Sequence, residues 1–346
     1  MINLSNLVLH LTEECNLRCK YCFMQRGSRR MSEETAKSAV DLLLTSCNEY
    51  ARVTFYGGEP LTEEPLLRKV TEYIKEKSHR PVVLGIVTNG TLISDSFLDF
   101  AEKHNIEIAV SYDGLENDDN RRNEDGCALL DISRLSDAIA KHRFTSSSVI
   151  TAANVRILYE NVVHLREVGF RSMNFFLDYS ENWKAEHVKM LRDAFERIAG
   201  KYVEWLKSGD RVKINKIDDM IECYVSGFGL SKTKVRRDLV FSVAVDGNVY
   251  PYASAVGNEK LCLGNVTTGM NRDMMKTVTS LGFVRGCEGC VINKACAAGI
   301  GNIITDDLLP HAYPIACHGY KIAFDTADWI VNKLIDENSP PAALNF

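Results

Sequence analysis

Three cysteines constrain this chain more than any other feature. Cys15, Cys19 and Cys22 share one short C-x3-C-x2-C loop, directly after the apolar run 7–11, which predicts a buried strand. Three thiolates on one loop can hold three irons of a [4Fe–4S] cube, because soft sulfur ligands suit iron–sulfur clusters. The fourth iron has no ligand nearby in the sequence, so it offers an open position where a small molecule can bind and react. A zinc loop or a redox thiol cluster is the alternative, since C-x2-C pairs also bind zinc.

Strands and helices alternate after this loop. Apolar runs predict strands at 7–11, 52–56, 82–88, 106–112, 147–151 and 172–177. Helical spacing predicts helices between them, including one that opens at Ser32 and others at 62–78, 131–142 and 157–168. Regular strand–helix repeats imply a parallel sheet with crossover helices. We therefore expect an α/β fold built on a partial (βα)6 TIM-like barrel, whose functional loops leave the carboxyl ends of the strands.

The cysteine loop resembles that of the radical S-adenosylmethionine (SAM) superfamily. Its spacing matches, an aromatic residue (Tyr21) precedes the last cysteine, and Gly57-Gly58-Glu59-Pro60 follows the second predicted strand. The resemblance implies that the open iron binds the amino and carboxylate groups of SAM. It further implies that one electron from the cluster splits SAM to methionine and a 5′-deoxyadenosyl radical, which abstracts a hydrogen atom from the substrate.

The same resemblance implies a set of SAM-binding residues. Glycine has no side chain to exclude a ligand from the backbone, and Glu59 would accept a hydrogen bond from the methionine amino group. Residues 118–122 (Asp-Asp-Asn-Arg-Arg) stand where the subfamily often has His-Asp-x-x-Arg. Asp118 therefore departs from the pattern, because it stands in place of the histidine. For the asparagines and aspartates, the alternative role is loop capping. The expected SAM contacts are Tyr21, Phe23, Gly57, Gly58, Glu59, Pro60, Asn89, Ser111, Asp113, Arg122 and Asn154.

The second half of the chain suggests two further units. Residues 1–182 would form the radical SAM partial barrel, residues 183–236 a helical connection, and residues 237–346 a small C-terminal β-hairpin/helical Fe–S cluster domain that ends in a helix. The hairpin is expected at 239–252, because Asp246-Gly247 favours a tight turn between two apolar runs. This region resembles the SPASM/twitch extension of radical SAM enzymes that modify peptides.

The C-terminal cysteines match part of that extension. Cys287, Cys290, Cys296 and Cys317 correspond to the complete ligand set of its second auxiliary cluster. The first auxiliary cluster is expected to be missing, because Tyr252 and Ile300 stand at or near its ligand positions and only Cys262 remains. We therefore expect two [4Fe–4S] clusters, one that binds SAM and one auxiliary. A structural zinc site is the alternative for the four C-terminal cysteines.

The remaining cysteines carry little information. Cys262 is the one catalytic candidate, either as a thiolate facing the substrate cleft or as a relic packed in the core, which free cysteine tolerates. Cys47, Cys127 and Cys223 are expected to be buried or incidental.

The resemblance favours a peptide maturase that installs thioether or related cross-links in a ribosomally made peptide. Either a separate leader-binding protein presents this precursor peptide or the barrel binds it unaided, and a flavodoxin or ferredoxin would supply electrons. Alternatives are dehydrogenation of a small molecule, sulfatase-maturase-like protein oxidation, and a non-catalytic Fe–S protein. Sulfatase maturases usually have an aspartate directly after the cysteine matched by Cys262, where this chain has Leu263.

Composition excludes other classes of protein. A net charge of −5 argues against a nucleic-acid binder, and the basic run 232–237 is expected to be a solvated loop or, alternatively, to steer an acidic partner. No signal peptide is evident, and no window approaches the roughly 18 apolar residues of a membrane span. Eleven cysteines without an export signal favour metal ligation in a reducing cytoplasm over disulfides.

Overall fold

The computed structural model describes residues 4–46, 50–142, 144–225, 239–280 and 313–336, together with Cys287, Gly289, Cys290, Ile292 and Cys296. Cys47, the basic run 232–237 and Ile300 therefore lie outside the described residues.

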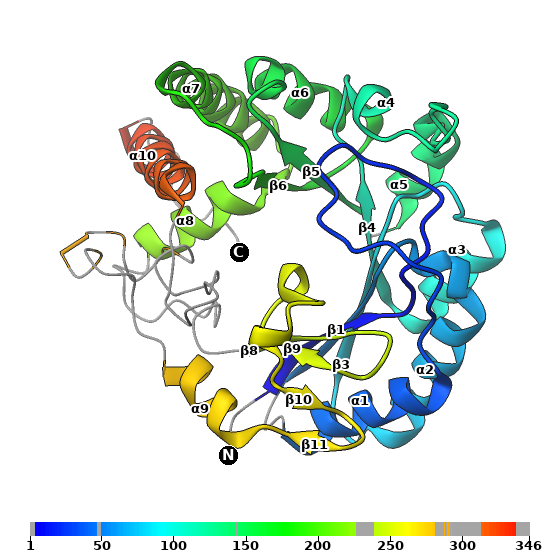
Figure 1. Ribbon diagram of the computed structural model, residues 1–346. Helices are drawn as coiled ribbons and strands as arrows, with labels where there is room; N and C mark the ends of the chain where they lie inside the picture. The colour runs from blue at the N-terminus through cyan, green and yellow to red at the C-terminus, as the bar shows by residue number, and fades with distance from the viewer. Residues whose placement is uncertain are drawn as a thin grey trace.

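A nine-stranded sheet forms the centre of the fold, and it is curved, with helices along its outer side (Figure 1). The strand order is β7-β6-β5-β4-β3-β2-β1-β8-β9, and every neighbouring pair is parallel except β8 and β9. The strands are β1 (Leu4–His10), β2 (Ala51–Tyr56), β3 (Val82–Thr88), β4 (Ile106–Ser111), β5 (Phe144–Ile150), β6 (Ser172–Leu177), β7 (Lys213–Ile214), β8 (Leu239–Val243) and β9 (Val249–Tyr250). A separate antiparallel pair joins β10 (Gly264–Asn265) to β11 (Gly269–Met270).

Helices lie between these strands along the chain and after the last of them. They are α1 (Glu33–Ser46), α2 (Glu64–Lys77), α3 (Asp95–His104), α4 (Asn117–Asn120), α5 (Ser136–Lys141), α6 (Leu158–Val168), α7 (Ala185–Lys207), α8 (Asn215–Val225), α9 (Arg272–Ser280) and α10 (Pro314–Asp336). Local sequence sets their ends. For example, the Ser94 side chain accepts a hydrogen bond from the Phe97 amide at the start of α3, and α3 stops at Asn105 in the left-handed conformation (φ 52°).

The core lies between the sheet and the helices. Along β2 the side chains alternate, so that Val53 and Phe55 are fully buried while Thr54 and Tyr56 face the other side. Leu43 of α1 and Leu67 of α2 are also fully buried in the same core. The α/β fold with a parallel sheet that the sequence predicted is confirmed.

The predicted hairpin is present as β8 and β9, but β8 also pairs in parallel with β1, with Leu7 opposite Phe241 and Leu9 opposite Val243. The hairpin thus extends the barrel sheet beyond the six strands that the sequence predicted. This pairing satisfies backbone groups along one edge of β1 that would otherwise lack partners. The division of the chain into three units stays a prediction.

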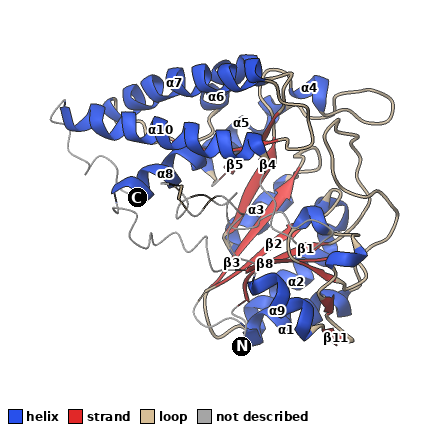
Figure 2. Ribbon diagram, turned by 60° about the vertical axis from the view of Figure 1, so that its left-hand side comes forward, coloured by secondary structure: helices blue, strands red, loops and turns tan. Residues whose placement is uncertain are grey.

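The C-terminal helix α10 packs against α7 and α8 (Figure 2). Ile322, Ala327 and Ile330 of α10 are buried. Gly319 allows a close approach, because a Cβ there would lie 2.6 Å from Cδ1 of Leu177 on β6. None of the helices in the described residues is long and apolar enough to span a membrane.

Candidate functional site

The three-cysteine loop follows β1 and crosses the carboxyl ends of the neighbouring strands (Figure 1). Cys15 and Cys19 are partly buried and Cys22 is exposed. Hydrogen-bond donors point at two of the sulfurs. The Leu17 amide lies 3.4 Å and Nδ2 of Asn89 lies 3.9 Å from Cys15 Sγ, and Nη1 of Arg121 lies 4.0 Å from Cys19 Sγ. Such donors stabilise a thiolate more than a thiol.

The Gly57-Gly58 turn supports this loop from below. Gly57 has φ 129°, which favours glycine, and a Cβ at Gly57 or Gly58 would overlap the carbonyl oxygen of Thr12 or Glu14, respectively. The Gly58 amide donates to Thr12 O at 2.8 Å, and the Glu59 amide donates to Glu14 O at 2.8 Å. The backbone that approaches these glycines is therefore that of the cysteine loop itself. Their predicted contact with SAM stays a prediction.

Glu59 joins the end of β2 to the end of β3. Its fully buried carboxylate accepts hydrogen bonds from the Asn89 amide at 2.7 Å, the Thr88 hydroxyl at 2.7 Å and the Leu61 amide at 3.1 Å. Desolvation raises the pKa of Glu59 to about 7, although these hydrogen bonds act in the opposite direction.

Asn16 and Asn89 form a closed hydrogen-bonded ring with Thr91 beside Cys15. Nδ2 of Asn89 donates to Oδ1 of Asn16 at 2.7 Å, and Nδ2 of Asn16 donates to the Thr91 hydroxyl at 2.8 Å. That hydroxyl in turn donates to Oδ1 of Asn89 at 2.7 Å. Sequence reasoning missed Asn16, and its position directly after Cys15 was the available signal.

Asp113, at the end of β4, anchors the other side of the loop. Its carboxylate accepts two hydrogen bonds from Arg121, at 3.0 and 3.1 Å, and one from the Val149 amide at 2.9 Å. The Tyr21 hydroxyl also donates to it. The Arg121 guanidinium lies 5.2 Å from the Tyr21 ring centroid. Although burial alone would lower the pKa of Arg121, the Asp113 carboxylate raises it, so the cation persists in a site that is only 8% exposed.

The side chain of Arg121, rather than that of Arg122, points toward the cysteines, although the Arg122 carbonyl accepts a hydrogen bond from the Arg18 amide of the cysteine loop. The exposed Arg122 side chain donates to the Gly126 carbonyl at 2.8 Å and to the Asp119 carboxylate at 3.0 Å. Sequence reasoning missed Arg121. Asp118 and Arg121 keep the Asp-x-x-Arg spacing when the motif is read one residue earlier, and this was the signal that could have identified it. Contact between Arg122 and SAM stays a prediction.

The other expected SAM contacts lie at the same edge of the sheet. Ser111 ends β4, Pro60 begins a short 3-10 turn after Glu59, and Phe23 is exposed directly after Cys22. The buried Asn154 uses its amide within its own loop, accepting from the Thr151 amide at 2.8 Å and donating to the Val149 carbonyl at 2.9 Å. Loop capping therefore accounts for Asn154 without a ligand.

The structure describes the four C-terminal cysteines, but it describes few of the residues next to Cys287, Cys290 and Cys296 in the chain. Cys296 is buried, whereas Cys287, Cys290 and Cys317 are partly buried. The Cys290 amide donates to the Cys287 carbonyl at 3.1 Å, which closes a C-x2-C turn. The partly buried Cys262 approaches the Gly264 carbonyl, with Sγ at 3.4 Å.

The donor set at Cys15, Cys19 and Cys22 fits an iron–sulfur cube. Desolvation raises the pKa of Cys15 to about 11 and also raises the pKa of Cys19, so both free thiols stay protonated at neutral pH. Bound iron would favour the thiolates, as would the sulfur-directed donors and the Arg121 cation. Within the described residues, no three His, Cys, Asp or Glu side chains gather closely enough to hold one metal ion. Each thiolate of a cube binds its own iron, so a cube does not require that arrangement.

Comparison with known proteins extends these observations. The family model for the Radical SAM superfamily matches residues 9–191, which is more than half of the chain. Over 330 residues, the chain is 26% identical to the cysteine-type anaerobic sulfatase-maturating enzyme of Clostridium perfringens, and the match covers 86% of this chain and 88% of that protein.

Two solved structures share the fold over most of the chain. Tagged anSMEcpe with bound AdoMet matches at a TM-score of 0.79 and 22% identity, covering 99% of this chain and 96% of that one. SuiB of Streptococcus suis, bound to its precursor peptide SuiA, matches at a TM-score of 0.64 and 14% identity, covering 90% of this chain and 76% of that one.

Proposed function

Because the chain belongs to the radical SAM superfamily, we propose that it modifies a peptide by SAM-dependent radical chemistry at the carboxyl ends of its parallel strands. Cys15, Cys19 and Cys22 would hold the cluster. A [4Fe–4S] cluster with SAM on its open iron supplies a 5′-deoxyadenosyl radical that can take a hydrogen atom from a substrate.

The observation that carries this proposal is the convergence of three strand ends on one loop. Glu59 follows β2, Asn89 follows β3 and Asp113 follows β4, and all three belong to hydrogen-bonded networks that contact the cysteine loop. Arg121 keeps a cation near Cys19 and thereby favours its thiolate. Glu59, whose pKa is raised to about 7, would ionise more fully beside the ammonium group of SAM.

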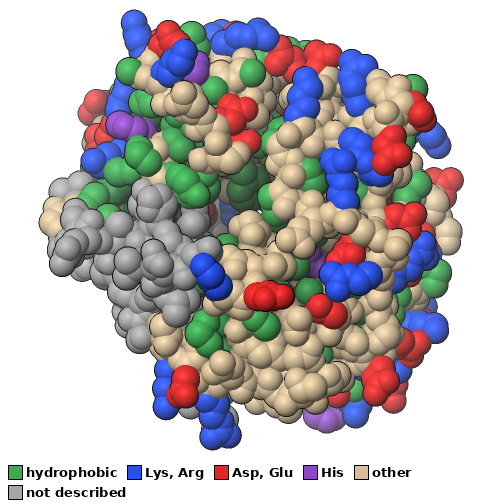
Figure 3. Space-filling model, viewed as in Figure 1, with side chains coloured by type: hydrophobic (Ala, Val, Ile, Leu, Met, Phe, Trp, Pro, Cys, Tyr) green, Lys and Arg blue, Asp and Glu red, His purple; other side chains and the backbone are tan. Residues whose placement is uncertain are grey.

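A peptide is the substrate class that the relatives favour. The sulfatase-maturating enzyme of Clostridium perfringens is related over nearly its whole length, and SuiB and anSMEcpe have been solved with peptides bound. Figure 3 shows this face of the protein hollowed at its centre, beside apolar side chains, and a peptide could bind there. Phe176 of β6 is 53% exposed, on the face of the sheet opposite the buried Phe175 and Leu177.

Within this class we propose a maturase that installs a thioether or related cross-link. Cys287, Cys290, Cys296 and Cys317 would hold an auxiliary [4Fe–4S] cluster, and a flavodoxin or ferredoxin would deliver electrons. Four cysteines close that cluster, so its role would be electron transfer and shaping of the substrate cleft.

Sulfatase-maturase-like oxidation is the second candidate, favoured by the near full-length match to the Clostridium perfringens enzyme. Against it stands Leu263, which occupies the position where those enzymes usually carry an aspartate. This side chain is fully buried in the core and offers no base.

Mass spectrometry of a cysteine-containing peptide distinguishes the two candidates. The peptide is incubated anaerobically with the reconstituted enzyme, SAM and dithionite. A thioether cross-link removes two hydrogen atoms and keeps the sulfur, whereas oxidation of the sulfatase type removes the sulfur. If 5′-deoxyadenosine forms but no precursor peptide encoded near the gene changes mass, the proposal of a peptide substrate is wrong.

A further inference from the structure

His10 is a buried polar residue that the proposed chemistry does not use. His10 is the last residue of β1, and it is only 2% exposed. Among the residues that the structure describes, neither Nδ1 nor Nε2 has a hydrogen-bond partner. The ring packs edge-to-face on Tyr56, with 5.2 Å between the ring centroids, which satisfies neither nitrogen. A neutral imidazole carries one donor and one acceptor, and leaving such groups buried and unpaired is unfavourable.

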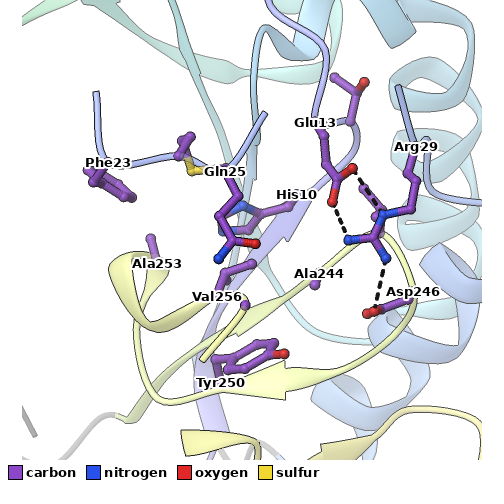
Figure 4. A pocket seen from close by; sticks show the side chains of 14 residues that line it. His10, Glu13, Phe23, Gln25, Arg29, Ala244, Asp246, Tyr250, Ala253 and Val256 are labelled. Carbon is purple, nitrogen blue, oxygen red and sulfur yellow. Dashed lines mark hydrogen bonds and ion pairs between the residues drawn. The ribbon is translucent and has the colours of Figure 1, made fainter. Parts of the chain in front are cut away.

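A small cavity adjoins this imidazole (Figure 4). Its volume is about 30 Å³, which exceeds the roughly 10–15 Å³ needed to hold one water molecule. Phe23 and Gln25, which follow Cys22 in the chain, line one part of it, and Ala244 and Val256 line another. The cavity therefore has room for one small group beside the unpaired ring.

The carboxamide of Gln25 lines the same cavity, and Gly257 makes its position possible. A Cβ on Gly257 would lie 2.6 Å from the amide carbon, nitrogen and oxygen of Gln25, and Gly257 has φ 89°. A carboxamide offers both donors and an acceptor. His10 and Gln25 together thus provide complementary hydrogen-bonding groups around one space.

The cavity lies at the functional edge of the barrel. His10 pairs with Tyr56 at the end of β2, and Ala244 directly follows β8. In barrels of this kind, ligands bind at the carboxyl ends of the strands. The residues after Cys22 form part of the wall, so the cavity and the cysteine loop share a segment of chain.

The charges around the cavity favour an uncharged ligand. Burial lowers the pKa of His10 to about 4, so the ring is neutral at physiological pH. Arg29 pairs with Glu13 at 2.5 Å and with Asp246 at 3.5 Å. An anion would face the carboxylates of Glu13 and Asp246. A cation would lose its hydrating water beside the neutral ring of His10, and both carboxylates are already paired with Arg29.

We propose that the His10 cavity is a subsite for one uncharged hydroxyl group, bound by the imidazole of His10 and the carboxamide of Gln25. This hydroxyl belongs to a water molecule when the cleft is empty, and a serine or threonine side chain of a bound peptide can replace it. The peptide side chain as the source of the hydroxyl rests on the proposed function, whereas water as its source does not.

The water source is tested by a high-resolution crystal structure of the anaerobically reconstituted enzyme without peptide. We expect density for one oxygen atom at about 2.7–3.2 Å from a ring nitrogen of His10. Nitrogen-15 labelling of the histidines gives a second readout, because a hydrogen-bonded ring N–H exchanges slowly with solvent. The His10 signals are assigned by comparison with His10→Phe. If His10→Phe does not fold, the Gln25→Met variant, changed at an exposed position, identifies the His10 signals instead. In this variant the ring N–H of His10 should exchange faster with solvent.

The peptide source is tested with two probes, N-acetyl-serinamide and N-acetyl-alaninamide, added to the labelled enzyme. We expect the serine probe to shift the His10 signals at a concentration at least tenfold below that needed by the alanine probe. Oxygen density with no response to either probe supports the subsite with water as its source. Equal responses to both probes contradict the preference for a hydroxyl, and an empty cavity with a rapidly exchanging ring N–H overturns the subsite.

These readouts do not depend on SAM cleavage. An enzyme that forms no 5′-deoxyadenosine but holds the oxygen at His10 would refute the proposed function and leave the subsite standing.

Discussion

The carboxylate of Glu59 accepts the backbone amide hydrogen of Asn89 at 2.7 Å, and this bond ties the end of β2 to the end of β3 directly beneath the cysteine loop. The Glu59 amide in turn donates to the Glu14 carbonyl, next to Cys15. One buried residue thus fixes three segments that come from different parts of the chain. Glu59 therefore connects the ends of β2 and β3 to the cysteine loop.

Arg121 and Arg122 provide a matched pair for testing which arginine supports the site. Arg121→Met leaves the Asp113 carboxylate buried without its cation, and breaking a buried pair in this way costs about 3–5 kcal/mol. Arg122→Met removes an exposed pair with Asp119 and should change the free energy of unfolding by less than about 1 kcal/mol. Chemical unfolding of both variants under anaerobic conditions measures the difference. Equal losses would show that Arg121 has no special role.

Gly58→Ala should displace the cysteine loop. The new Cβ would overlap the Glu14 carbonyl oxygen, and overpacking of this kind costs about 1–3 kcal/mol. We expect a lower melting temperature and less iron bound per chain after reconstitution. Gly200→Ala is the control, because a Cβ at this position in α7 meets no atom within 4 Å and should stabilise the helix by about 0.5–1 kcal/mol. Full iron loading in Gly58→Ala would contradict the packing role of the turn.

Glu59 should make the SAM-free protein less stable as the pH rises. Its pKa is raised from 4.5 to about 7 by burial, so between these values the folded state binds a proton that the unfolded state has released. The contribution of Glu59 to the free energy of unfolding therefore falls across this range, by up to about 3 kcal/mol. His10, whose pKa is lowered from 6.5 to about 4, acts in the opposite sense.

The difference in unfolding free energy between the wild type and Glu59→Gln cancels the His10 contribution. It should shift in favour of the glutamine variant as the pH rises from about 5 to 7. A difference that stays constant with pH would show that the Glu59 carboxyl group titrates normally.

The C-terminal cysteines should bind iron independently of the SAM site. Cys287→Ala combined with Cys290→Ala should lower the iron content from about eight to about four per chain. Some 5′-deoxyadenosine should still form in strong chemical reductant, while modified peptide falls much further. Wild-type protein that holds only about four irons and binds zinc at these cysteines would refute the two-cluster proposal.

The sequence was sufficient to predict the barrel because each strand and helix carries its own periodic pattern. The cysteine spacing and the Gly57-Gly58-Glu59-Pro60 turn likewise pointed to two segments that the structure brings into contact. The pairing of β8 with β1 was missed, because two strands so far apart in the chain carry no local signal that they are neighbours.

Side-chain direction was the other feature that the sequence did not reveal. Arg121 and Arg122 are adjacent, and which of them turns inward depends on how the four-residue helix α4 ends against the cysteine loop. Asn16 was missed for a similar reason, because its partners Asn89 and Thr91 come from a distant loop. The two glycines were expected to make room for a ligand, and their close contact with the backbone of the cysteine loop appears only in three dimensions.

The most direct test of the account is the formation of 5′-deoxyadenosine from SAM by the anaerobically reconstituted protein with dithionite. The wild type should form it, and replacement of Cys15, Cys19 and Cys22 by alanine together should abolish it. Cys127→Ala, at an exposed cysteine outside the loop, is the matched control and should retain wild-type activity. Undiminished 5′-deoxyadenosine formation by the triple variant would contradict the assignment of these three cysteines to the radical SAM cluster.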